Sequence, residues 1–98
     1  MPDKEYILSA IKSKEAEIFK YGIKSIGLFG SYARDEQSEN SDVDILIDFE
    51  PGMENFDNYM AVYDIIEKLF KNLKVEVVTR NGLSPYIGPE ILKEVRYA

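Results

Sequence analysis

Two carboxylates placed two residues apart are the first feature of this sequence that could do chemistry. Asp42 and Asp44 begin the alternating run 42–49, and side chains at i and i+2 of a strand project from the same face. Two ionised carboxylates held this close repel each other unless they share a proton or a cation. Because oxygen ligands suit hard divalent cations, the pair is a candidate site for Mg²⁺ or Mn²⁺.

A Gly–Ser pair upstream could complement such a metal site. Gly30 and Ser31 follow a short apolar run, and ten residues separate Ser31 from Asp42. A helical turn after this pair would present backbone N–H groups and a hydroxyl to a phosphate. A phosphate-binding turn beside metal-binding carboxylates is typical of phosphoryl and nucleotidyl transfer, although either feature alone is a weak signal.

Composition excludes several other kinds of catalysis. The 98 residues include no cysteine and no histidine, which excludes disulfides, thiol nucleophiles, zinc–thiolate sites and Ser-His-Asp triads. Residues 35–67 hold 11 of the 18 acidic residues and no basic one. This block should repel nucleic acids and anionic membranes, so we expect no direct nucleic-acid or membrane partner. No signal peptide or membrane span is predicted, and the expected location is the cytoplasm.

The elements that must position these residues follow from hydrophobic periodicity. Helical spacing predicts helices over residues 4–21 and 57–72, and a short last helix that Pro89 opens. Alternation predicts strands over 25–29, 42–49 and 75–79, with a polar loop over 35–41. The helix between the second and third strands is long enough for a parallel crossover. The link between the first and second strands is short, so it can reverse the direction of the chain. We therefore expect a small mixed sheet in a single domain, residues 1–98.

The order of these motifs resembles a known family. The strings FGSYAR at 29–34, SDVDILIDF at 41–49 and KVEVVTR at 74–80 are similar to the minimal nucleotidyltransferase family of the DNA polymerase beta-like superfamily. The resemblance covers nearly the whole chain. It implies an α+β fold in which helices pack on one face of a small mixed sheet.

The resemblance also implies roles for individual residues. The triphosphate would be held by Gly30, Ser31 and Arg34, and two Mg²⁺ ions, with Mn²⁺ as a substitute, by Asp42, Asp44 and Glu76. The third carboxylate would also help to deprotonate an acceptor hydroxyl. From the residues alone, Arg34 is equally suited to phosphates or to an ion pair with the acidic loop.

The sequence departs from the family's usual pattern at two positions. Glu76 stands where the family normally has Asp, which moves the carboxylate outward by about one bond length. Asp35 replaces a usual Gly and adds negative charge near the expected phosphate path. Three further interpretations concern neighbouring side chains: Arg80 is a weaker nucleotide-side candidate, Asp48 is a solvated carboxylate, and Tyr32 is a possible stacking residue beside the Gly–Ser turn.

Two functions remain open at this point. Family members of this kind often serve as antitoxins, paired with a HEPN-domain ribonuclease toxin, and transfer AMP from ATP to a tyrosine of that toxin. The resemblance therefore implies a Mg²⁺-dependent protein adenylyltransferase that forms a hetero-oligomer with its toxin. The alternative is a weakly active or inactive antitoxin that neutralises its partner by binding alone. Unchanged neutralisation after Asp42→Asn or Asp44→Asn would favour the second function.

Overall fold

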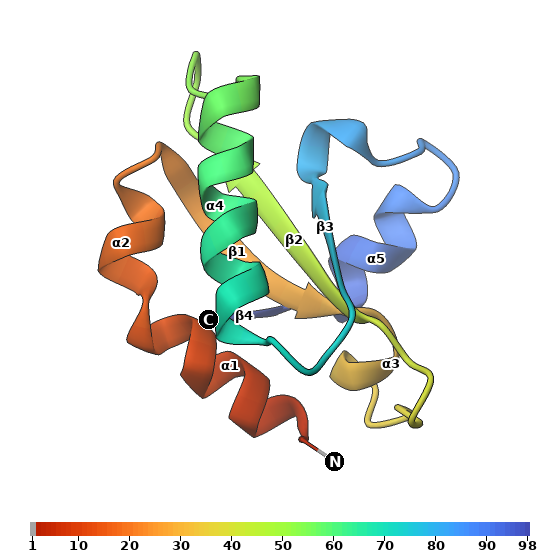
Figure 1. Cartoon of the computed structure of the whole chain (residues 1–98). Helices are drawn as coiled ribbons and strands as arrows, with labels where there is room; N and C mark the ends of the chain where they lie inside the picture. Colours follow the sequence, from red (N-terminus) through yellow and green to blue (C-terminus); the bar gives the residue numbers. More distant parts are fainter. Residues whose placement is uncertain (1) are drawn as a thin grey trace.

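A four-stranded mixed β-sheet forms the centre of the computed structural model, which describes residues 2–98 (Figure 1). The strand order is β3-β2-β1-β4, with the bounds Ile23–Phe29 for β1, Val43–Phe49 for β2, Val75–Thr79 for β3 and Arg96–Tyr97 for β4. β1 is antiparallel to both β2 and β4, and β2 is parallel to β3. The predicted mixed sheet is therefore confirmed, including the chain reversal after β1 and the parallel crossover after β2.

The helices surround this sheet, and the two longest begin at capping side chains. Their bounds are Lys4–Ser13 for α1, Glu15–Phe19 for α2, Gly30–Ala33 for α3, Phe56–Leu69 for α4 and Gly88–Glu94 for α5, with a 3₁₀ turn, η1, over Arg80–Gly82. Asp3 caps α1 by accepting the N–H of Tyr6, and Asn55 caps α4 by accepting the N–H of Asn58. No helix within residues 2–98 is long and apolar enough to cross a membrane.

The predicted single helix over residues 4–21 is wrong, because the chain breaks at Lys14 into α1 and α2. Lys14 leaves helical geometry, with φ −114° and ψ 12°, and its N–H donates to the carbonyl of Ile11 at 3.0 Å. Residues 12–15 offer no apolar side chain that would hold the middle of a continuous helix against the sheet. Ile11 and Ile18, on either side of the break, are both fully buried.

Most of the core lies between the sheet and the helices α1, α2 and α4. The inward side chains of β2 are Val43, Ile45, Ile47 and Phe49, as the alternation predicts, and all four are buried. They pack with Ile7 and Ile11 of α1, Ile18 of α2, and Val62 and Ile66 of α4. Burying an aliphatic side chain of this size stabilises the fold by about 1.5–3 kcal/mol, so this layer fixes the sheet in place.

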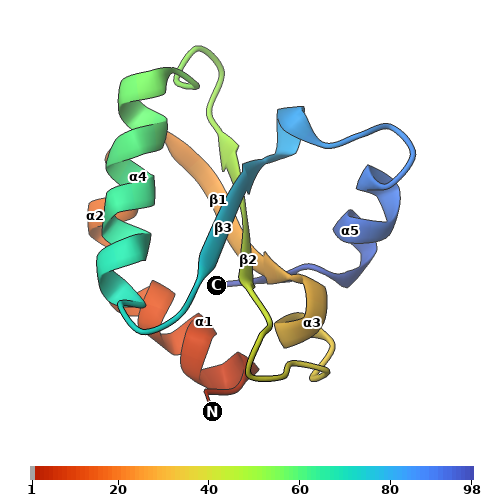
Figure 2. The same ribbon diagram turned by 45° about the vertical axis from the view of Figure 1, so that its right-hand side comes forward.

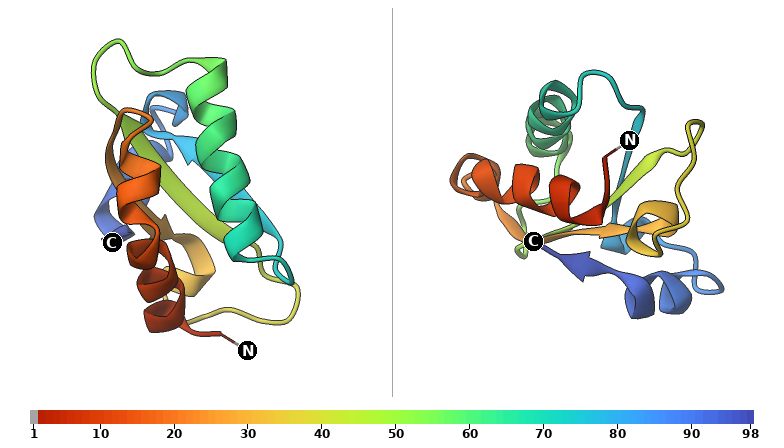
Figure 3. Two further views of the ribbon diagram at one scale, coloured as in Figure 1. Left: turned by 60° about the vertical axis from the view of Figure 1, so that its left-hand side comes forward. Right: turned by 90° about the horizontal axis from the view of Figure 1, so that it is seen from below.

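The opposite face of the sheet is covered by α5, which corrects the expectation that the helices pack on one face (Figure 2). A second, smaller cluster joins Phe29, Leu46 and Val95, with Val78, Leu83, Ile91 and Leu92 packed against it. The view from below shows α5 on one side of the sheet and α4 on the other (Figure 3). The α+β class is confirmed, with a thin second layer that the sequence interpretation did not include.

The last strand, β4, was also absent from the sequence prediction. Gly27 and Tyr97 are partners in the antiparallel pairing of β1 and β4, and the N–H of Ala98 donates to the carbonyl of Ile26 at 3.0 Å. A Cβ on Gly27 would overlap the side chain of Val95, so the close approach of α5 and β4 to β1 requires glycine here. β4 therefore anchors the end of α5 to the sheet.

Candidate active site

Three carboxylates gather at the end of the sheet where β2 and β3 begin. Asp44 is in register with Phe29 of β1 on one side and with Glu76 of β3 on the other. Asp42 immediately precedes β2. Asp42, Asp44 and Glu76 each offer a carboxylate oxygen, and these three oxygens lie within 4.8 Å of one another. The central place of β2 thus brings together residues that are distant in the sequence.

The cluster lies on the face of the sheet that α5 covers. Alternate residues of a strand share a face, and Leu46 and Val78, two residues beyond Asp44 and Glu76, belong to the cluster beneath α5. Asp42 and Asp44 are half-buried, whereas Glu76 is exposed. Solvent and a second molecule can therefore reach the cluster from the side of Glu76.

The electrostatics of the cluster favour a bound cation. Burial, as the largest cause, and the negative charges of Glu76 and Asp42 together raise the pKa of Asp44 from 3.8 to about 6, while the positive charge of Arg34 acts in the opposite direction. Lys74 is the basic side chain paired with Asp42, at 3.9 Å, and it is 82% exposed. An exposed pair of this length contributes little, so most of the negative charge is left uncompensated.

The donor set fits a hard divalent cation. All three ligand atoms are carboxylate oxygens, and within residues 2–98 no other group of acidic side chains comes together in this way. Mg²⁺ and Mn²⁺ prefer oxygen ligands, and Mg²⁺ is usually held in proteins by one or more carboxylates together with substrate phosphates. The three carboxylates fit such an ion.

The Gly–Ser turn lies directly beside Asp44. β1 ends at Phe29, and α3 begins at Gly30, whose φ of 74° falls in the left-handed region that favours glycine. A Cβ on Gly30 would also overlap the carboxylate of Asp44. Ser31 is half-buried, and its hydroxyl makes no hydrogen bond with another residue of the described chain. Glycine is therefore required to bring Ser31 and the start of α3 against the carboxylates.

Arg34 is held by two carboxylates. Its Nε donates to Glu36 at 2.9 Å, and its Nη1 donates to both oxygens of Glu94, at 2.9 and 3.2 Å. These bonds raise the pKa of Arg34 above its usual value, with the bond to Glu36 as the largest cause. The ion pair with the acidic loop, one of the two interpretations of Arg34, is present. The sequence reasoning missed Glu94, because sixty residues separate it from Arg34 and no motif marks it.

Four other expectations can be compared with the structure. Asp48 is not simply solvated, because it lies 3.8 Å from Arg80 at the far end of β2. This pairing keeps Arg80 at the end of the sheet opposite to the carboxylate cluster. Tyr32 is 2% exposed within the core, so it cannot stack on a nucleotide. Asp35 is ion-paired with Lys4 at 3.3 Å and has a φ of 57°, a conformation that explains why glycine is usual there.

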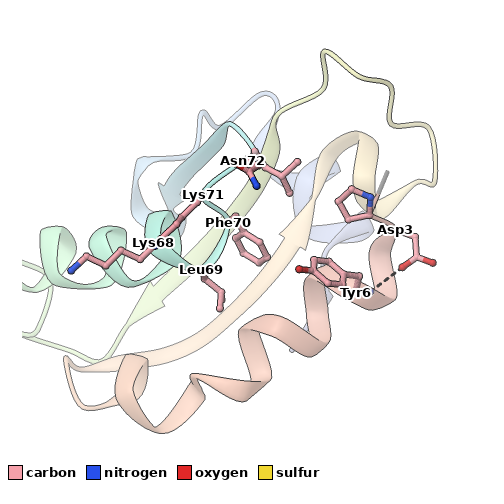
Figure 4. A pocket seen from close by; sticks show the side chains of 9 residues that line it. Asp3, Tyr6, Lys68, Leu69, Phe70, Lys71 and Asn72 are labelled. Carbon is pink, nitrogen blue, oxygen red and sulfur yellow. Dashed lines mark hydrogen bonds between the residues drawn. The ribbon is translucent and has the colours of Figure 1, made fainter.

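A pocket lies elsewhere, on the face of the sheet that α1 and α4 cover. It has a volume of about 640 Å³ and lies between the start of α1 and the end of α4 (Figure 4). Tyr6, Lys68, Leu69 and Lys71 are among the residues that line it. None of the three clustered carboxylates contributes to this pocket, so it is separate from the candidate active site.

Comparison with known sequences gives one consistent answer. The nucleotidyltransferase domain family matches residues 7–98. A protein adenylyltransferase named MntA, from Thermococcus cleftensis, is 39% identical over 93 residues, which are 95% of this chain and 90% of the relative. A Methanocaldococcus jannaschii protein named as a candidate protein adenylyltransferase is 41% identical over 88 residues, which are 89% of this chain and 92% of the relative.

Comparison with solved structures agrees with the comparison of sequences. A structure described as a candidate minimal nucleotidyltransferase superposes with a TM-score of 0.81 at 27% identity, covering 97% of this chain and 95% of the other. A toxin–antitoxin structure containing AMP-PNP matches with a TM-score of 0.62 at 22% identity, over 88% of this chain and 70% of the other, which supports the fold. The chain belongs to the nucleotidyltransferase domain family and is a nucleotidyltransferase of the minimal type.

Proposed function

We propose that this nucleotidyltransferase transfers AMP from ATP to a hydroxyl of a partner toxin and thereby acts as an antitoxin. The observation that carries the proposal is the meeting of Asp42, Asp44 and Glu76 beside the Gly30–Ser31 turn. The name of the Thermococcus cleftensis relative supports protein adenylylation. The toxin–antitoxin structure with AMP-PNP supports both ATP as the donor and a toxin as the partner.

The three carboxylates would hold Mg²⁺, which neutralises phosphate charge and lowers the pKa of a hydroxyl bound to it. The Ser31 hydroxyl and the N–H groups that follow Gly30 in α3 would bind the phosphates, since the first N–H groups of a helix have no intrahelical partner and that of Gly30 is already donated to Glu94. Nη2 of Arg34 would add a charged donor. The acceptor oxygen attacks the α-phosphorus, the new O–P bond forms as pyrophosphate leaves, and Glu76 receives the hydroxyl proton.

The acceptor is proposed to be a tyrosine of a HEPN-type toxin. This assignment rests on the family resemblance, and the exposure of Glu76 is compatible with it, because a side chain of a large partner can approach from that side. The acidic block over residues 35–67 favours a protein acceptor over a polynucleotide, whose phosphates it would repel. The complex of the two proteins is the proposed hetero-oligomer.

The test is the mass of both proteins after incubation of the chain with its partner, ATP and Mg²⁺. We expect the toxin to gain the mass of one or more adenylyl groups, and peptide mapping to place them on tyrosine. Asp42→Asn and Asp44→Asn should each abolish the gain. Asp64→Asn, which removes an exposed carboxylate from α4, is the matched control and should leave it unchanged.

The binding-only antitoxin remains the second candidate, and the exposed Glu76 in place of the usual Asp is the observation that favours it. A longer and more mobile carboxylate holds its ligand less firmly, because more side-chain entropy is lost on binding. This function predicts a tight complex without any change of mass. It also predicts full toxin neutralisation by Asp42→Asn and Asp44→Asn, which would contradict the catalytic proposal.

A further inference from the structure

Glu94 makes an unusual set of contacts at the edge of the candidate active site. Its Oε1 accepts the backbone N–H of Gly30 at 3.1 Å, and both of its oxygens accept from Nη1 of Arg34, at 3.2 and 2.9 Å. The carboxylate therefore contacts both ends of α3, the short helix that contains Ser31. These contacts link α5 to the turn that is expected to bind phosphate.

The position of Glu94 on α5 is unfavourable unless its charge is compensated. Glu94 is the last residue of the helix, where the helix dipole disfavours a carboxylate by about 0.3–1 kcal/mol. The guanidinium of Arg34 and the Gly30 N–H supply this compensation. The side chain of Glu94 is 25% exposed, against 65% for Glu36, so its pair with Arg34 is the less screened of the two.

The pairing leaves part of Arg34 available. A guanidinium has five N–H donors, of which Nε is directed to Glu36 and Nη1 to Glu94. Nη2 makes no hydrogen bond with another residue of the described chain, and its two donors are therefore available to a phosphate. Two fixed contacts orient a planar guanidinium, so Glu36 and Glu94 together determine where Nη2 points.

The end of α5 that carries Glu94 is itself firmly held. Val95, the next residue, is buried against Phe29 and Leu46, and the adjoining strand β4 pairs with β1. Phe29 directly precedes Gly30. The packing of Val95 on Phe29 and the hydrogen bond of Glu94 to Gly30 therefore hold two neighbouring residues. A side chain anchored in this way can hold α3 against the sheet, in contrast to Glu36, which belongs to the loop that follows α3.

We propose that Glu94 is a positioning residue for nucleotide binding, which sets the orientation of Ser31 and Arg34 by holding the Gly30 N–H and Arg34 Nη1. This inference rests on the proposed function, because it assigns the phosphates of ATP to that turn. Glu94 acts through α3 and is not itself a ligand of the phosphates. Its loss should therefore weaken the binding of ATP more than it slows the transfer step.

The experiment compares Glu94→Ala and Glu94→Gln with Glu90→Gln as the matched control. Glu90 lies on the same helix, is 74% exposed and pairs only with Lys93 among the residues described. The first measurement is amide hydrogen exchange of the ligand-free protein. We expect exchange at Gly30 to be at least about tenfold faster in Glu94→Ala, intermediate in Glu94→Gln, whose amide oxygen can still accept, and unchanged in the control.

The second measurement is the affinity for ATP with Mg²⁺ by calorimetry, together with KM and kcat of transfer. We expect Glu94→Ala to bind ATP about tenfold more weakly and Glu94→Gln about threefold more weakly, with a raised KM and a kcat changed by less than about twofold. Unchanged or tighter ATP binding in either variant would overturn the proposal, and tighter binding would show that Glu94 competes with phosphate.

The two measurements separate this inference from the proposed function. If the wild type binds ATP but transfers no AMP, the proposed function fails. The ATP affinities of the wild type and of the Glu94 variants then still test the role of Glu94. If the wild type binds no nucleotide, the proposed function fails, and unchanged Gly30 exchange in Glu94→Ala would refute the positioning role as well. If Glu94→Ala does not fold, the same two measurements are made on Glu94→Gln, provided that it melts at the wild-type temperature.

Discussion

Removing the charge of Asp44 should stabilise the metal-free protein. Burial and the neighbouring carboxylates raise the pKa of Asp44 from 3.8 to about 6, so the folded state holds a proton that the unfolded state releases. Asp44 therefore stabilises the fold below about pH 4, and this contribution is lost as the pH rises towards 6. At pH 7.5 the ionised side chain of Asp44 therefore lowers the stability of the folded protein, and Asp44→Asn removes this destabilisation.

The size of the effect follows from the shift. A shift of about two pKa units corresponds to about 3 kcal/mol, and screening by solvent at this half-buried position reduces it to about 1.5 kcal/mol. For a domain of this length, 1 kcal/mol changes the melting temperature by about 4–8 °C. Asp44→Asn should therefore melt about 6–12 °C above the wild type at pH 7.5.

The assay is thermal unfolding followed by circular dichroism in EDTA, at pH 4 and at pH 7.5. The difference between Asp44→Asn and the wild type should be near zero at pH 4, where both side chains are neutral, and should reach its full value at pH 7.5. Asp64→Asn serves as the control, since its exposed carboxylate should give no such difference. A variant that is less stable than the wild type at pH 7.5, or a difference independent of pH, would refute the electrostatic reasoning.

Three further outcomes are expected from the same geometry. Addition of Mg²⁺ at pH 7.5 should raise the melting temperature of the wild type by several degrees and leave that of Asp44→Asn unchanged, as measured by differential scanning fluorimetry. Gly30→Ala should destabilise the protein by about 1–3 kcal/mol in urea unfolding, because it adds strain at a positive φ and displaces Asp44; wild-type stability would contradict the structure. Glu76→Asp should transfer AMP at least as fast as the wild type, whereas Glu76→Gln should be slower by about 10²-fold or more; equal rates for these two variants would exclude Glu76 as the proton acceptor.

Strict alternation explains why β2 and β3 could be predicted almost to the residue. The run 42–49 has a period of two, and the structure gives β2 over Val43–Phe49 and β3 over Val75–Thr79. Helical periodicity is less reliable where polar residues interrupt the stripe. The chain turns at Lys14 for this reason, and α4 ends at Leu69 because Phe70 turns into the core with 3% of its surface exposed.

The candidate site was predictable only in part. The Asp42–Asp44 pair and the Gly–Ser turn are visible in the local sequence, because each depends on contacts between near neighbours. Glu76 was identified from the resemblance alone, since its place beside Asp44 depends on the register of two parallel strands. Glu94 could not be identified, because its contact with α3 depends on how α5 packs on the second face of the sheet.

The alternation of β2 has a consequence for folding as well as for chemistry. One face of the strand carries Ile45 and Ile47 into the core, while the other carries Asp44 and Asp48. A slip of one residue against β1 would exchange these faces and bury two carboxylates, at several kcal/mol for each unpaired charge. The acidic side chains on one face of β2 therefore disfavour the misaligned sheet.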